Sequence, residues 1–177
     1  MLAHSGPTLA VLVLLALAGG MKVASPDLTS GALRAARLPH GRSAVRVLGL
    51  VEVTIGVSAI VLGTSIMAFG AATFYAGFAW FVIHALRHRL PIASCGCFGA
   101  AETPPSINHV IVNIGAVLLL TFATIYPIGP FGGIEQLSAL MAFAFVGFVG
   151  VTVYLLYGIL AVLPQVQQRR VEEGSLL

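Results

Sequence analysis

The sequence predicts an all-α membrane protein, built as a bundle of about five transmembrane helices. The first observation behind this prediction is composition: 58% of the 177 residues are hydrophobic and 8% are charged. A soluble domain has about 25% charged residues, and so few charges cannot cover a molecule of this size against water. Low polarity, glycines without a three-residue period and only two cysteines also exclude a disordered chain, a collagen and a secreted disulfide scaffold.

The second observation is the spacing of the apolar segments. A helix crosses the roughly 30 Å hydrocarbon layer with about 20 apolar residues. Such windows predict five spans in a single transmembrane domain, at residues 8–24, 44–64, 68–86, 107–126 and 137–163. The second and third windows adjoin, and we place the turn between them at residues 63–70. We expect the first window to be a retained helix and not a cleaved signal peptide, because no Lys or Arg precedes it.

The basic residues predict an orientation, because cytoplasmic loops collect Lys and Arg. All nine lie in or beside the first loop, the third loop or the C-terminal tail, which five spans place on one side. We therefore expect the N-terminus outside and the C-terminus in the cytoplasm. The net charge of +3 indicates contact with anionic lipid and not with nucleic acid.

A short interfacial helix is predicted in the first loop, starting at Pro26 and Asp27. Leu33 and Leu38 would face lipid, and the nearby arginines would face the head groups.

Glycines recur every seven residues through the second and third spans. Helices in lipid associate through small residues, which let their backbones approach. Gly49, Gly56 and Gly63 should form one packed seam of the second span, with Glu52 and Ala59 between them.

The third and fourth spans also carry residues that share a face. The same spacing aligns Gly70, Gly77 and His84 on the third span. The corresponding polar set on the fourth span is Ser106, His109 and Asn113.

Depth along the helices predicts a polar cluster in the cytoplasmic third of the membrane. Its members are Lys22, Glu52, His84, His109 and Asn113. An ionisable group at depth is usually paired, so we expect an ion pair between Glu52 and either Lys22 or Arg46. That pair would either set the helix register or handle a proton. His84 and His109 would act as bases or would simply place their rings among the head groups.

Both cysteines lie in one motif, Cys95-Gly96-Cys97-Phe98-Gly99, within the loop at residues 87–106. A disulfide between cysteines so close requires a bend, which Gly96 permits, and closes a small strained ring. Strain raises the reduction potential and favours an exchanging disulfide over a structural one. Neighbouring Arg and His side chains and the start of the fourth span would stabilise a thiolate.

Three interpretations of the motif remain open. Thiol-disulfide exchange is favoured. A copper or zinc site could add His88, His109 or Glu102 as ligands, although a tetrahedral site usually uses a second cysteine pair. The cysteines could also be small buried hydrophobes in a structural or assembly subunit of a membrane complex.

The cysteine motif, with Leu48-Gly49-Leu50-Val51-Glu52 before it and Asn113 after it, resembles the MauE family of methylamine-utilisation membrane proteins. Gly20-Met21-Lys22 followed by Pro26-Asp27 is similar to the wider DoxX-like group. The likeness covers roughly residues 17–120 and implies a four-helix core plus one further helix.

The resemblance also implies a function. It is that of a multi-pass protein of the bacterial plasma membrane, acting with a thioredoxin-like partner, MauD, in disulfide formation on the methylamine dehydrogenase small subunit. Cys95 and Cys97 would be the redox pair of a thiol-disulfide oxidoreductase component. In such an exchange one thiolate attacks a partner disulfide and the other resolves it. His84 or His109 would assist as base, and Glu52 would couple a proton.

The predicted side of the cysteine loop conflicts with that function. The basic residues place the loop in the cytoplasm, where thiols are kept reduced, whereas the implied partner works outside. One cysteine pair cannot carry electrons across roughly 30 Å of hydrocarbon. Three resolutions are open, and the first is favoured: the loop re-enters the membrane and meets both sides, a quinone-like carrier or a further membrane subunit completes the path, or the orientation is reversed.

Overall fold

The computed structural model describes residues 2–92, 104–163 and 166, and these residues contain helices and no strand. Five helices are long and apolar enough to cross a membrane, which confirms the predicted fold class. They are α1 (Leu2–Ala24), α3 (Arg42–Leu62), α4 (Ser65–Arg87), α5 (Ile107–Ile125) and α6 (Ala139–Tyr157). Shorter elements are α2 (Pro26–Ala35), η1 (Pro130–Gln136) and η2 (Gly158–Val162), a π-helical turn that continues α6.

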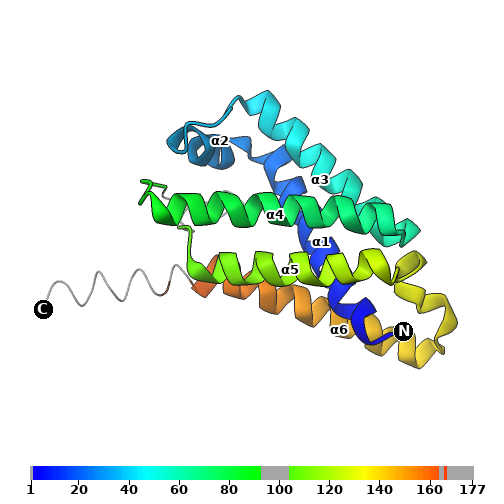
Figure 1. Ribbon diagram of the computed structural model, residues 1–177. Coiled ribbons are helices and arrows are strands. Elements are labelled where there is room, and N and C mark those ends of the chain that lie inside the picture. The colour runs from blue at the N-terminus through cyan, green and yellow to red at the C-terminus, as the bar shows by residue number, and fades with distance from the viewer. Residues whose placement is uncertain (1, 93–103, 164–165, 167–177) are drawn as a thin grey trace, which may run out of the picture.

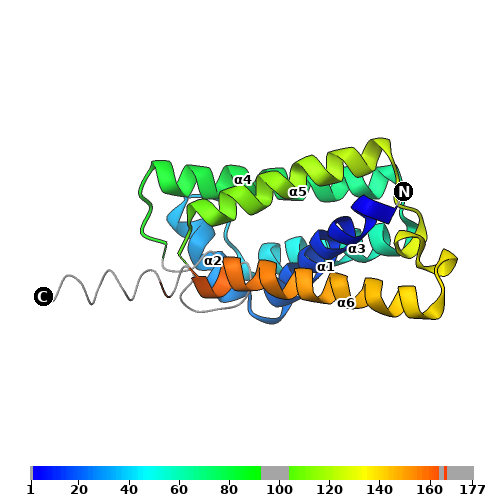
Figure 2. The same cartoon turned by 90° about the horizontal axis from the view of Figure 1, so that it is seen from below.

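The long helices form a bundle around α1. Figure 2 shows α4 and α5 side by side along one side, α6 along the opposite side, and α1 with α3 between them. The largest fully buried side chains include Leu12, Leu14 and Leu15 of α1. By contrast, α6 buries none of its residues. The first helix therefore occupies the centre, and α6 presents nearly its whole length to the surroundings.

The seam between α1 and α3 is built on glycine, as predicted for Gly49 and Gly56. A methyl group added at Gly49 would lie 2.6 Å from the carbonyl oxygen of Gly19, and one at Gly56 would lie 3.0 Å from that of Leu12. No side chain fits at such a distance from backbone, so the two helices pack with their backbones in contact.

The turn between α3 and α4 is shorter than the predicted range. Only Gly63 and Thr64 separate the helices. Gly63 is the C-cap of α3 at φ +58°, a left-handed conformation that favours glycine, and it abuts the backbone of Gly129.

Gly70 and Gly77 share a face of α4, as predicted, but this face is not tightly packed. A methyl group at Gly77 would meet nothing within 4 Å, and one at Gly70 would make only ordinary contact with the Ile55 side chain. The buried face of α4 instead carries small and aromatic residues such as Ala71 and Tyr75. The seven-residue spacing continues into α4, but the glycines that it selects lie outside the buried face of that helix.

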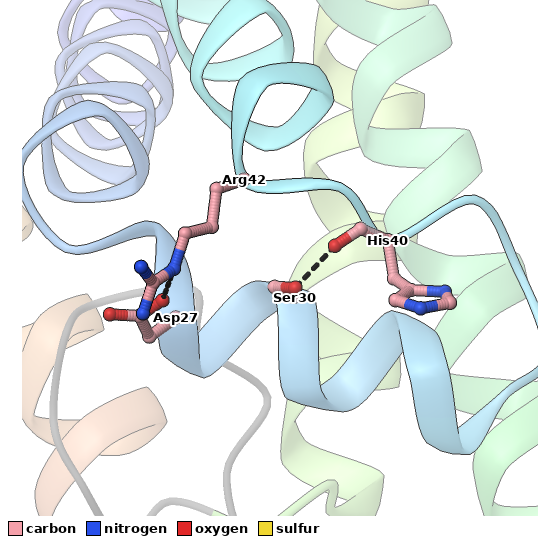
Figure 3. Close-up of polar contacts among 4 residues, drawn as sticks. All are labelled: Asp27, Ser30, His40 and Arg42. Atoms are coloured by element: carbon pink, nitrogen blue, oxygen red, sulfur yellow. Dashed lines mark hydrogen bonds and ion pairs between the residues drawn. The ribbon is translucent and has the colours of Figure 1, made fainter.

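The predicted helix in the first loop is present as α2. Leu33 and Leu38 are half-buried and line a pocket beside α4, so they do not project freely into lipid as expected. Arg42 donates to Asp27, and the Ser30 hydroxyl donates to the carbonyl oxygen of His40 (Figure 3). These exposed contacts connect α2 to the start of α3.

Candidate functional site

A buried ion pair joins the last turn of α1 to the middle of α3. Lys22 Nζ donates to Glu52 Oε2 at 2.7 Å, with side-chain exposures of 3% and 0%. Of the two partners predicted for Glu52, the structure selects Lys22, and Arg46 is exposed. A charge at this depth is costly unless it is paired. Each side chain therefore stabilises the buried charge of the other.

Two glycines bring the pair together. Gly19 lies three residues before Lys22, and Gly49 lies three residues before Glu52. Each helix therefore has a glycine about one turn before its charged residue and on the same face. A methyl group at Gly19 would lie 2.8 Å from Glu52 Cβ, and one at Gly49 would lie 2.9 Å from Lys22 Cβ. Gly19 was not predicted, because nothing in its local sequence distinguishes it from its neighbour Gly20.

The ion pair lies next to an aromatic ring, and one of its own oxygen atoms has no hydrogen-bond partner among the described residues. Lys22 Nζ lies 4.8 Å from the centre of the Phe78 ring, a cation–π contact. Glu52 Oε1 is buried, and it has no hydrogen-bond partner among the residues that the structure describes. One oxygen of the carboxylate is therefore free to accept a hydrogen bond or a proton.

A second polar group lies on α5. Ser106 Oγ and His109 Nδ1 are 2.8 Å apart, and His109 and Asn113 are both buried, so the predicted polar face of this helix is confirmed. His109 and Asn113 line a narrow cavity together with Phe78. Phe78 also contacts Lys22, so it adjoins both of the polar groups that the sequence had placed in one cluster.

His84 belongs to neither group. Its ring stacks on Trp80 with centroids 5.4 Å apart and planes 15° apart, and the His88 ring follows at 4.4 Å. The three rings form a row along α4 that runs toward the loop containing the cysteines.

Cys95 and Cys97 lie outside the described residues, and so does Glu102. The chain leading to the motif is described: Ile92 is buried in a cluster with Ala32 of α2 and Ala85 of α4. Among the described residues, no three His, Cys, Asp or Glu side chains converge on a possible metal position.

A family model described as "Methylamine utilisation protein MauE" matches residues 2–127. The chain belongs to the MauE family. No curated protein and no solved structure matches it.

The match to the MauE family covers α1 to α5 and ends before η1 and α6. Four of the five long helices are therefore in the family region, as are the Lys22–Glu52 pair and the cysteine motif. Membership of the MauE family indicates a membrane protein of methylamine utilisation.

Proposed function

We propose that this MauE-family protein is a thiol-disulfide redox component of the bacterial plasma membrane. Cys95 and Cys97 would exchange disulfides with a thioredoxin-like partner and so support disulfide formation in an extracytoplasmic protein. The observation that carries the proposal is that the MauE match includes the Cys-Gly-Cys motif. In support, the loop that contains the motif leaves α4 beside the row of His84 and His88.

The exchange proceeds in two steps when it oxidises the partner. A partner thiolate attacks one sulfur of the Cys95–Cys97 disulfide, the S–S bond breaks, and a mixed disulfide forms. The second partner thiolate then attacks the mixed disulfide, which releases an oxidised partner and a Cys95, Cys97 dithiol. Two electrons and two protons pass from the partner to this chain.

Nearby side chains would handle the protons of these steps. His84 and His109 are the proposed bases, since a neutral imidazole carries one ring nitrogen that can accept a proton. Glu52 is the proposed proton carrier within the bundle, because its Oε1 has no hydrogen-bond partner among the described residues.

We further propose that the N-terminus is outside and the C-terminus is cytoplasmic, as the positions of the nine basic residues indicate. The loop at residues 87–106 would then reach an external partner by re-entering the membrane. The ends of α2 and α4 and the start of α5 lie together at one end of the bundle (Figure 1).

The experiment that tests this function is trapping of the mixed disulfide. In Cys97→Ser, the Cys95 thiolate attacks the disulfide of an oxidised partner and forms a mixed disulfide that Cys97 can no longer resolve, so we expect a covalent adduct that reductant removes. Cys95→Ser is the reciprocal variant, and the double variant is the control without adduct.

Two outcomes would contradict the exchange. If neither single variant forms an adduct under oxidising conditions, the cysteines do not exchange disulfides. Stoichiometric copper or zinc in the purified protein, lost with both cysteines, would assign them to a metal site instead.

A further inference from the structure

A pocket with a volume of about 380 Å³ lies between α2 and α4, next to the buried ion pair. This volume is within the range of sites for small molecules, about 300–1,000 Å³. Its walls are almost entirely apolar, with Leu33 from α2 and Phe74, Phe78 and Phe81 from α4. Gly77 also lines it, and the absence of a side chain there leaves the space open.

The pocket communicates with the lipid-facing surface of α4. Trp80 lines it and is 56% exposed, and Gly77 and Thr73 are exposed on the same side. A ligand would therefore enter from the hydrocarbon layer, and it would itself be lipophilic.

Among the residues that the structure describes, Lys22 is the charged one that reaches this apolar space. Lys22 lines the pocket although only 2% of the residue is exposed. An ammonium has three N–H donors, and among the described residues Glu52 Oε2 is the one hydrogen-bond acceptor that Nζ contacts. Donor capacity remains for an oxygen atom of a ligand.

The net charge of the Lys22–Glu52 ion pair is zero, and this favours a neutral ligand over an anionic one. Because the Glu52 carboxylate lies 2.7 Å from Lys22 Nζ, the positive charge is already balanced. An anionic phosphate head group would meet no net positive charge there and would approach the carboxylate. A neutral ring with a carbonyl oxygen can accept from Nζ and stack on the aromatic walls.

We propose that this pocket binds the ring of a membrane quinone, whose carbonyl oxygen accepts a hydrogen bond from Lys22 Nζ. The inference rests on the proposed function, which leaves a dithiol that must be reoxidised. In that step two thiols lose two electrons and two protons and form one S–S bond. The quinone takes up both electrons and both protons and becomes a hydroquinone.

The path of the chain joins this pocket to the cysteine motif. Ala32 and Phe81 line the pocket and also belong to the cluster around Ile92. Cys95 follows Ile92 by three residues, which span at most about 11 Å when fully extended. Covalent geometry therefore limits how far the motif can lie from the pocket.

The test uses the one tryptophan of the chain, Trp80, as a probe within the pocket. We expect decylubiquinone to quench the fluorescence of the full-length protein in lipid nanodiscs with a saturable component above the linear quenching caused by partition. Gly77→Leu fills the pocket and should weaken the saturable component at least about tenfold, which corresponds to about 1.4 kcal/mol.

The matched control is Gly115→Leu on α5. A methyl group at Gly115, as at Gly77, would meet nothing within 4 Å, so this variant should fold and bind decylubiquinone like the wild type. Saturable quenching that is absent in the wild type, or unchanged in Gly77→Leu, would overturn the inference. Equal competition by phosphatidylglycerol would also overturn it, since the pocket would then hold a lipid chain only.

A Cys95→Ser/Cys97→Ser variant separates this inference from the proposed function. It should bind decylubiquinone like the wild type, because it leaves Lys22 and the aromatic walls of the pocket unchanged. If decylubiquinone binds but neither single cysteine variant traps an adduct, the pocket is still a quinone site and disulfide exchange is rejected. A trapped adduct without saturable binding would reject the pocket alone.

Discussion

At the residue scale, the main feature of the molecule is the buried salt bridge between Lys22 and Glu52. Both side chains are almost completely buried, and their charges meet at 2.7 Å. Arg42 and Asp27 also form an ion pair, but both side chains are mostly exposed. Exposed pairs contribute little to stability because water screens them, whereas removal of one partner from a buried pair leaves a charge in a medium that does not solvate it.

A double-mutant cycle on this pair tests its energetic role. We expect Lys22→Met alone, or Glu52→Gln alone, to lower the free energy of unfolding in detergent by about 3–5 kcal/mol. The double variant should be clearly more stable than Lys22→Met, because it leaves no unpaired charge. Urea or thermal unfolding followed by circular dichroism measures the effect. Additive losses in the double variant would show that the two charges do not interact.

At the element scale, the contact between α1 and α3 depends on glycines whose partners are backbone atoms. The spacing of glycines along α3 was visible in the sequence, and for Gly49 and Gly56 the structure confirms it. The same spacing failed for Gly77, because periodicity indicates which residues share a face and not which face meets a neighbour. Gly19 was missed for the related reason that only its approach to Gly49 shows its role.

Substitution of Gly49 tests this seam. Gly49→Ala places a methyl group 2.6 Å from the carbonyl oxygen of Gly19, so α1 and α3 must separate. Overpacking of this kind typically costs about 1–3 kcal/mol, and thermal unfolding in detergent should show the loss. Gly147→Ala on α6 is the control, because its methyl group would meet nothing within 4 Å. Equal stability of the two variants would mean that the seam is not tightly packed.

At the scale of the whole molecule, the bundle has two chemically different ends. The basic first loop, the end of α4 and the start of α5 lie at one end, and η1 lies at the other with the start of α1 (Figure 1). Because Lys and Arg collect on the cytoplasmic side, the end with α2 should face the cytoplasm.

Labelling from outside intact cells tests this orientation. Single cysteines are introduced as Ser43→Cys at the start of α3 and as Gln136→Cys in η1, both exposed, in the Cys95→Ser/Cys97→Ser background. A membrane-impermeant maleimide should label the cysteine at position 136 and leave that at position 43 unlabelled until the cells are lysed. The reverse pattern would place the cysteine loop outside, directly accessible to an extracytoplasmic partner.

The sequence by itself determined the number of long helices, their approximate limits and the residue types of the site. Hydropathy and length decide these properties, because a span of about 20 residues must be apolar and must pair its backbone amides within its own helix, wherever its neighbours lie. It also limited the partner of Glu52 to Lys22 or Arg46. Only the tertiary structure decided between them, brought Phe78 next to both polar groups, and folded α2 beside α4 to form the pocket. These features depend on how helices rotate and approach one another, which packing between elements sets and local sequence does not.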